Sequence, residues 1–376
     1  MNKEEWERVR ESYSGWEIIS DDGSIKPCVG CFGCWIKTPG QCVIKDGYDH
    51  TPSMIHRADE VMVNSWYTYG GFSSFVKNVI DRSIGYVLPF FEINEGEMHH
   101  RSRYPEMKPM TFIFRGNDLS DEEKQKARQY VEAVCMNLKG LCRDVIFETA
   151  ENEPVQDLKV KPASENTSGE IIALNCSLRG DNANSKKFLD RFASYLDGPV
   201  KAVNLGAYLA KQEELLELLL SADRMILGIP LYVDGIPSAP LRVMEKLERN
   251  GGMEGKKIYV IANMGFYESS QLKNLLSQVK MWCDKCSAVY GGGLAIGAGE
   301  MLGGFMGAKS IEKGPAKNVA EAMGRLAVAV NGSEITDDIY AGPAYFPRAF
   351  YMFAANSGWP KGIKSNGLKK KDLYRM

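Results

Sequence analysis

The chain has 376 residues, of which 44% are hydrophobic and 25% charged, and its formal net charge is −2. This length suggests two domains of ordinary globular composition. The balanced charge lacks the electrostatic footprint of a nucleic-acid-binding protein. No apolar run reaches the ~18 residues of a membrane span, and the charged N-terminus is unlike a secretion signal. We therefore expect a cytoplasmic protein with neither nucleic acid nor a membrane as partner, and a solvated basic end at 369–371.

The first half alternates short apolar runs with amphipathic segments. In chain order it predicts a short strand at 16–20, a cysteine-rich loop, a helix at 48–57, a strand at 58–65, a helix at 75–83, a strand at 110–114 and a helix at 120–138. A further helix is predicted at 3–13.

The second half shows the same alternation more clearly. It predicts strands at 170–175, 200–203, 222–229 and 257–262, and helices from 185 onward and at 211–221, 239–249 and 269–286. Strands that alternate with helices favour a parallel sheet with helices on both faces.

Four segments of the first half match segments of the second in order and character: 58–65 with 222–229, 75–83 with 241–249, 110–114 with 257–262, and 120–138 with the helix that begins at 269. We interpret the chain as a diverged tandem duplication. Its predicted parts are a first domain at 1–151, a linker at 152–168, a second domain at 169–332, and an aromatic and basic extension at 333–376 whose helix packs on the core or on a partner. No counterpart of strand 170–175 is found in the first half.

The loop 177–185 (SLRGDNANS) lies between a buried strand and a helix, where backbone N–H groups and the helix N-terminus can bind an anion. Ser177, Arg179, Asn182, Asn184 and Ser185 are the candidate phosphate ligands. The alternative is an ordinary turn in which Asn184 or Ser185 caps the helix.

Two more loops follow predicted strands at the sheet edge where open parallel sheets bind ligands. Their mixture of aromatic side chains, glycine turns and backbone donors suits a planar ring with polar edges. The candidates are Pro230, Leu231, Tyr232, Val233, Asp234 and Gly235 in one loop, and Asn263, Met264, Gly265 and Tyr267 in the other. Tyr232 and Tyr267 could instead be ordinary loop aromatics.

The order strand, S-x-R-x4-N-S, helix, and then A-D-x4-G-x-P-x-Y-x4-P-S resembles the NAD(P)H-dependent FMN reductase family over residues 170 to about 304. The resemblance implies a flavodoxin-like fold, with the first loop on the FMN phosphate and the other two on the flavin ring. The predicted fold class is therefore two flavodoxin-like α/β domains with parallel sheets, the first lacking its first strand and its phosphate loop.

Four of the nine cysteines form the motif C-x2-C-x2-C-x7-C, at Cys28, Cys31, Cys34 and Cys42. Closely spaced thiolates separated by glycine can wrap one iron–sulfur cluster, here predicted as [4Fe–4S]. Zinc is a weaker alternative because four-thiolate zinc sites usually place two pairs farther apart. The remaining alternative is a set of free thiols in a tight loop.

The cysteines and the segment after them resemble the archaeal and anaerobe iron–sulfur flavoproteins, with Ser73, Lys77, Asp81 and Arg82 at matching positions and Trp66 and Thr68 departing from the pattern. Members of that group are dimers or larger, with the cluster of one subunit near the flavin of another. The resemblance implies that this chain is a fused pseudo-dimer with one cluster and one FMN, which could also form a homo-oligomer.

Other features have plainer interpretations. We expect Cys283, Cys286 and Cys176 to be structural thiols, and His99 and His100 to lie in a solvated loop. The glycine-rich run 291–307 lacks the setting of a dinucleotide site and suggests a mobile loop over the flavin.

The sequence thus predicts an FMN-dependent oxidoreductase that takes electrons from NAD(P)H or from a ferredoxin-like protein and passes them to a small molecule or a redox protein. The flavin would supply the chemistry, and no catalytic acid or base can be named. Alternatives are a non-enzymatic electron carrier of the flavodoxin kind and a degenerate binding module.

Overall fold

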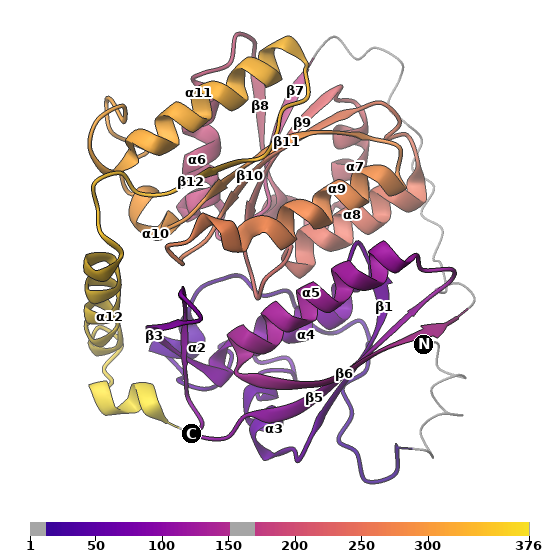
Figure 1. Ribbon diagram of the computed structural model, residues 1–376, viewed down its shortest axis with the longest axis vertical. Helices are drawn as coiled ribbons and strands as arrows, with labels where there is room; N and C mark the ends of the chain where they lie inside the picture. The colour runs from indigo at the N-terminus through magenta and orange to yellow at the C-terminus, as the bar shows by residue number, and fades with distance from the viewer. Residues whose placement is uncertain (1–12, 151–169, 376) are drawn as a thin grey trace.

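The computed structural model describes residues 13–150 and 170–375. The second half is built on a six-stranded parallel sheet (Figure 1). Its order is β12-β11-β10-β9-β7-β8, formed by β7 (Ile171–Asn175), β8 (Val200–Asn204), β9 (Arg224–Pro230), β10 (Lys257–Asn263), β11 (Val289–Ile296) and β12 (Ile339–Ala341). Because β8 and β9 lie on opposite sides of β7, the strand order reverses there, which is the point at which open parallel sheets generally bind ligands.

Helices cover both faces of this sheet. One face carries α7 (Gln212–Leu220), α8 (Ser238–Asn250) and α9 (Lys273–Lys285). The other carries α6 (Asn184–Ala193) and α11 (Lys317–Gly332). In α7 the buried leucines are spaced three and four residues apart, which puts them on one stripe against the sheet.

The first half has a four-stranded sheet of order β2-β1-β5-β6. Its strands are β1 (Val61–Thr68), β2 (Gly71–Phe72), β5 (Lys108–Gly116) and β6 (Gly140–Thr149), and its helices are α2 (Gly33–Ile36), α3 (Thr51–Arg57), α4 (Ser74–Arg82) and α5 (Asp121–Leu138). The short β2 runs antiparallel to β1 and lies where a first parallel strand would pair. The predicted lack of that strand is therefore seen in residues 13–150.

The helices of the two halves meet in the middle of the molecule, where α4 and α5 face α8 and α9 (Figure 1). Residues 13–150 contain no counterpart of α6 or α11, and Leu141 and Ile146 of β6 are 55% and 38% exposed. Helices thus cover both faces of the second sheet. On the described first sheet, the helices cover the face that is directed toward the second half.

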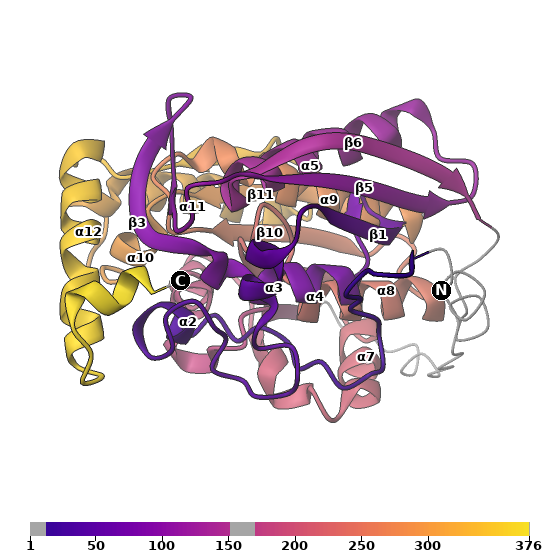
Figure 2. The same cartoon turned by 90° about the horizontal axis from the view of Figure 1, so that it is seen from below.

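Two further elements join the halves. A hairpin of β3 (Val87–Asn94) and β4 (Glu97–Ser102) is inserted between α4 and β5. The helix α12 (Arg348–Lys364) leaves the second half, packs on β3, and leads to a 3-10 turn, Lys370–Tyr374 (Figure 2). There the buried Arg103 guanidinium donates to the Leu373 and Arg375 carbonyls, each at 2.7 Å.

Several predictions from the sequence were wrong. Residues 16–20 form no strand. The run 291–307 is not a mobile loop, since it contains β11 and the short helix α10 (Gly299–Leu302). Its glycines have a packing role, because a Cβ at Gly291 would collide with the Tyr259 ring and one at Gly293 with Leu276.

The prediction of a solvated loop at His99 and His100 was also wrong. Both residues belong to β4, where His99 is buried and His100 half-buried, and the His100 ring lies 4.7 Å from Trp35 and 5.2 Å from Phe266 between ring centroids. Burial lowers the pKa of His100 to about 3.

Residues 3–12 of the predicted N-terminal helix and the linker 152–168 lie outside the described residues. Cys176, Cys283 and Cys286 are buried, as expected.

The interface between the halves has a reciprocal pair of helix caps. The Ser238 N–H at the start of α8 donates to the Asp81 carboxylate on α4, at 3.0 Å. The Ser74 N–H at the start of α4 donates to the Glu245 carboxylate on α8, also at 3.0 Å. This exchange is what a two-fold interface between duplicated units produces. It equates Ser74 with Ser238, so the sequence match of 75–83 to 241–249 was two residues out of register.

Lys77 and Asp81 form an ion pair inside this interface, with side chains 1% and 0% exposed. Lys77 Nζ also donates to the Tyr232 carbonyl at 2.7 Å. Burial raises the pKa of Asp81 to about 6, against the opposing effect of Lys77. Asn137 of α5 makes the second polar link, because its Nδ2 donates to both Asp234 oxygens at 2.8 Å while its Oδ1 lies 2.9 Å from His99 Nδ1.

We predict that Asp81→Asn lowers the free energy of unfolding by about 3–5 kcal/mol, because it leaves Lys77 charged, buried and without a counter-ion. Lys186 and Asp190 offer a matched control, since they have the same spacing but lie 18% and 54% exposed. Asp190→Asn should cost at most about 1 kcal/mol. Urea unfolding of both variants measures the difference, and equal losses would contradict a structural role for the buried pair.

A pH-dependent effect is expected at Asp234, where burial raises the pKa to about 6 although Asn137 opposes the rise. An unfolded aspartate titrates near 3.9, so between about pH 4 and pH 6 the folded state holds a proton that the unfolded state has lost. The stability contributed by this carboxyl is therefore full below about pH 4 and declines as the pH rises to 6.

Asp234→Asn removes this titration. Its stability relative to the parent should improve by up to about 3 kcal/mol between pH 4 and pH 7. Denaturant unfolding across that range measures the trend. Asp284→Asn, at an exposed carboxyl of α9, should show no such trend. If the stability difference between Asp234→Asn and the parent does not change with pH, the Asp234 carboxyl of the parent titrates normally.

Candidate functional site

The loop after β7 is held in a compact shape by hydrogen bonds of its own side chains. Asn175 at the end of β7 accepts from the Ser177 N–H at 3.2 Å and donates to the Gly180 carbonyl at 3.2 Å. The next helix, α6, begins after Ala183 with no side-chain cap. Its first N–H groups are donors of the kind that a phosphate satisfies, and the alternative of a turn capped by Asn184 or Ser185 is not what this helix shows.

The other predicted loops lie beside this one. Asn263 Nδ2, at the end of β10, donates to Ser185 Oγ at 2.8 Å and so links the third loop to the phosphate loop. The Leu231 N–H donates to the Asn263 carbonyl at 2.8 Å, which links the second loop to the third. The carboxyl ends of β7, β9 and β10 thus bring Ser185, Asn263 and Leu231 together, as parallel strands should.

Tyr232 lies at the centre of this arrangement. Burial raises the pKa of its hydroxyl above the usual range, with Cys28 and Asp81 adding to the rise and Arg179 and Ser177 opposing it. Val233 and Asp234 have φ values of 37° and 63°, so the chain makes a tight left-handed turn directly after Tyr232. This turn aims Tyr232 toward the phosphate loop and the following residues toward the first half.

The remaining predicted residues of these loops lie in other directions. Val233 and Asp234 contact Tyr130 and Asn137 of α5, and a Cβ at Gly235 would meet Gln278. Two of the predicted residues in the third loop are engaged by the C-terminal segment, because Tyr351 Oη donates to the Gly265 carbonyl at 2.5 Å and Tyr267 Oη to the Phe346 carbonyl at 2.8 Å. Met264 is buried, Asn182 is exposed, and Pro230 ends β9.

The four cysteines lie in one loop of the first half. Cys34 and Cys42 are buried, Cys28 is half-buried and Cys31 is exposed. Burial, and then the charges of the other three thiols, raise the pKa of Cys34 well above its usual range. Burial, followed by the charge of Asp81, raises the pKa of Cys28 to about 12. The four sulfurs therefore lie within electrostatic reach of one another.

Thiols that influence one another's pKa can still lie farther apart than the ligands of one metal ion. In the described residues no three His, Cys, Asp or Glu side chains are grouped at metal-binding spacing. The surroundings nevertheless suit bound thiolates: the Gly33 N–H donates to Cys31 Sγ at 3.4 Å. Burial disfavours the charged form of Arg82. Hydrogen bonds with Asp46 and Cys42 outweigh this effect and raise the pKa of its guanidinium. A cluster at these cysteines stays a prediction.

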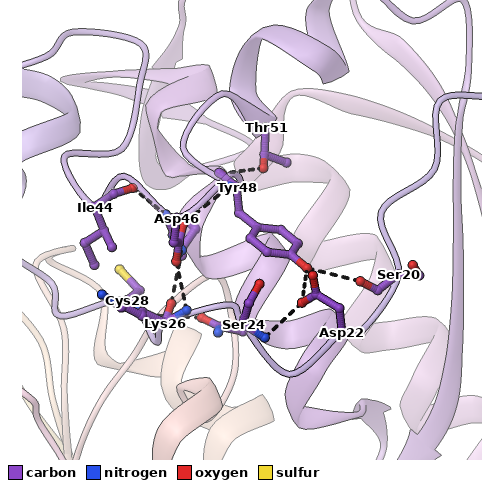
Figure 3. Close-up of polar contacts among 11 residues, drawn as sticks. Ser20, Asp22, Ser24, Lys26, Cys28, Ile44, Asp46, Tyr48 and Thr51 are labelled. Atoms are coloured by element: carbon purple, nitrogen blue, oxygen red, sulfur yellow. Dashed lines mark hydrogen bonds and ion pairs between the residues drawn. The ribbon is translucent and has the colours of Figure 1, made fainter.

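Arg82 closes the base of the cysteine loop. It donates to the carbonyls of Lys26 and Ile44 and to the Asp46 carboxylate, and Asp46 also accepts from the Lys26 N–H at 2.9 Å. Figure 3 shows this Asp46 contact beside Cys28, and beyond it Tyr48 Oη bonded to Asp22 at 2.8 Å. The two ends of the loop are thereby held together on α4.

The cysteine loop and the predicted FMN loops are in direct contact. A Cβ at Gly30, which has φ of 64°, would collide with Tyr232 Oη. The Arg179 guanidinium of the phosphate loop lies over the Phe32 ring, 5.7 Å from its centroid. Arg179 also pairs with Glu300 of α10 at 3.3 Å. Two modules that are about 150 residues apart in the sequence thus form one site, whose residues come from both halves.

Sequence reasoning missed several residues of this site. Asn78 accepts from the Cys28 N–H at 3.3 Å, Asn137 holds Asp234, and Trp359 of α12 contacts Phe32 with ring centroids 5.8 Å apart. The first two are buried polar residues inside amphipathic helices, which is a weak signal without a structure. The hollows of about 250 Å³ beside Arg191 and about 590 Å³ beside α12 touch none of the predicted residues, so the site rests on the contacts between loops.

No family model matches the chain. An iron-sulfur flavoprotein of Methanocaldococcus jannaschii is 37% identical over 68 residues, which are 18% of this chain and 34% of that protein. The match therefore spans about a third of the relative's length.

No helix in the described residues is both long and apolar enough to traverse a bilayer.

Solved structures with similar folds include an azoreductase of Bacillus anthracis (15% identity, 43% of this chain and 99% of that one, TM-score 0.33). They also include an NADPH-quinone reductase of P. pentosaceus (19%, 44% and 97%, TM-score 0.29) and general stress protein 14 of Treponema denticola in complex with FMN (13%, 42% and 98%, TM-score 0.31). The strand order of the second half, β8-β7-β9-β10-β11, is that of a flavodoxin-like fold, and the chain is distantly similar over a short segment to an iron-sulfur flavoprotein.

Proposed function

We propose that this protein is an FMN-dependent oxidoreductase in which the first half holds an iron–sulfur cluster beside the FMN of the second half. One observation carries the proposal: the cysteine loop touches the predicted FMN loops, through Gly30 against Tyr232 and Phe32 against Arg179. Neither half has both modules, so the chain would act as a pseudo-dimer with one redox centre of each kind.

The second half has the groups that FMN needs. The uncapped first turn of α6, the Ser177 hydroxyl and the Arg179 guanidinium would bind the phosphate, because all of them donate to anions. Tyr232 and the loop after β10 would contact the ring. When bound, FMN supplies one- and two-electron chemistry. The protein's part is to orient the ring, and the first half excludes water from the Tyr232 side.

The first half has the groups that a cluster needs: four thiols, peptide N–H groups at Gly30 and Gly33, and the buried cation Arg82. Hydrogen bonds to the sulfurs and nearby charge are the means by which proteins tune such clusters. The similar protein of Methanocaldococcus jannaschii carries the name iron-sulfur flavoprotein, which agrees with this proposal. The electron donor would be NAD(P)H or a ferredoxin-like protein.

The FMN proposal predicts a preference for the phosphate. The protein should bind FMN more tightly than riboflavin, and Arg179→Ala should reduce that preference about tenfold by removing one charge-assisted contact. Arg143→Ala, at an exposed arginine of β6, should leave it unchanged. Flavin fluorescence quenching measures all the affinities. Equal affinity of the unaltered protein for FMN and riboflavin would rule out the phosphate site.

The cluster proposal predicts about four iron atoms and matching sulfide per chain after anaerobic reconstitution. Cys34→Ser and Cys42→Ser should lose most of this iron and the visible charge-transfer absorption. Cys283→Ser, at a buried thiol of α9, should retain both. Iron that is absent from the unaltered protein, or unaffected by the loop variants, would remove the cluster from the proposal.

NAD(P)H oxidation with a quinone or oxygen as acceptor tests whether the protein is an enzyme. We expect flavin-dependent turnover with one of the two nucleotides. Failure with both, in protein that holds FMN, would point to an electron carrier instead.

A further inference from the structure

The C-terminal segment 343–376 differs in charge from the rest of the chain. It contains seven Lys and Arg residues and one acidic residue, Asp372, whereas the whole chain has a formal net charge of −2. Of these cations, Arg348 and Arg375 are ion-paired with Glu268 and Asp372. The five lysines, Lys361, Lys364, Lys369, Lys370 and Lys371, are exposed. An acidic protein thus presents one strongly basic region.

The same segment exposes large aromatic side chains. Tyr345, Phe350 and Phe353 are 82%, 64% and 72% exposed. Phe350 and Phe353 lie three residues apart on α12, so they share one side of that helix. Exposed aromatic residues grouped in this way, with a rim of charge, mark an interaction site more often than an ordinary surface.

A hollow of about 590 Å³ lies beside these residues, between α12, the β3–β4 hairpin and the C-terminal turn. Phe90 and Tyr374 stack in its wall with ring centroids 5.6 Å apart, and Phe353 lines it as well. Its charged lining residues are Arg101 and Lys370, and no carboxylate lines it. A hollow with aromatic walls and a cationic edge can receive a protruding side chain and the acidic groups around it.

This surface adjoins the cysteine loop. Trp359 of α12 packs against both Phe32 and Trp35, with ring centroids 5.8 Å and 5.3 Å away. Phe32 and Trp35 lie within the cysteine motif, in which Cys31 is exposed. A protein bound on α12 would therefore lie next to the proposed cluster.

We propose that α12 and the C-terminal turn form the docking surface for a small acidic electron-carrier protein of the ferredoxin type. The inference rests on the proposed function and names its protein partner. Charge complementarity favours such a partner, since an excess of lysine steers an acidic protein to one face and speeds its association. An anionic membrane is the competing partner. We favour the protein because this surface is hollowed, whereas lipid-binding helices present a continuous apolar face.

The test uses the full chain and a plant-type [2Fe–2S] ferredoxin as probe, with binding measured by calorimetry at low and at physiological salt. We expect binding at low salt that weakens with added salt. The triple variant K364E/K370E/K371E should weaken it at least about tenfold. Lys201→Glu, at an exposed lysine on β8, should change it less than about twofold. Urea unfolding verifies that each variant is folded.

A second pair of variants tests the aromatic contribution. Phe353→Ala should weaken binding several-fold at both salt concentrations, whereas Val328→Ala, at a 69% exposed side chain of α11, should not. The proposal is overturned by absence of ferredoxin binding, by equal binding of the triple variant and Lys201→Glu, or by binding to phosphatidylserine vesicles in place of ferredoxin. Binding requires no FMN or iron, so protein that holds FMN but ignores ferredoxin refutes only the docking surface.

Discussion

The structure depends on one face of a nine-residue helix, α4. Lys77 and Asp81 lie one turn apart and reach into the second half, where they hold the Tyr232 carbonyl and the Ser238 N–H. Asn78 and Arg82, one residue further along, hold the cysteine loop. All four side chains are at most 2% exposed. Buried charges and amides are costly unless their partners are in place. The helix therefore fixes both loops of the site at once, and neither loop can shift without leaving a polar group unpaired.

The two-fold relation between α4 and α8 explains how this arrangement can be stable. The reciprocal caps at Ser74 and Ser238 link equivalent helices, so the two halves meet as two copies of one ancestral unit would. Arg179 of the loop after β7 lies over Phe32 in the cysteine loop of the first half. The edge of β1 that the missing strand would cover is partly covered by the two-residue β2, which pairs antiparallel with Tyr67 and Thr68.

Much of the second half could be predicted from the sequence. Strands such as β7 and β9 are continuous apolar runs that end in turn residues, and local pattern is enough to find them. The position of the loop 177–185 could be predicted for the same reason, since it joins two easily recognised elements, whereas its phosphate binding stays a prediction. The reductase and flavoprotein resemblances pointed to Tyr232 and to Lys77, Asp81 and Arg82, but not to the contacts between them.

The rest is decided by tertiary contacts that a local pattern does not contain. The strand β11 is rich in glycine because Tyr259 and Leu276 occupy the space of its side chains, and this makes it look like a loop. His99 and His100 look solvated because their neighbours are charged, yet the loop after β10 buries them against Phe266. The run 16–20 has the residues of a strand but no neighbouring strand with which to pair.

The hydrogen bonds from Arg103 to the Leu373 and Arg375 carbonyls have a consequence for folding during synthesis. This buried guanidinium and its acceptor at Arg375 are 272 residues apart in the sequence. At about 5–20 residues per second, a ribosome needs roughly 15–50 s to make the intervening chain. The buried side chains of α4 likewise lack their partners until the residues around Tyr232 and Ser238 have been made. The N-terminal half thus emerges with its buried charges unmatched, and it can reach its native state only after the residues around Arg375 have been made.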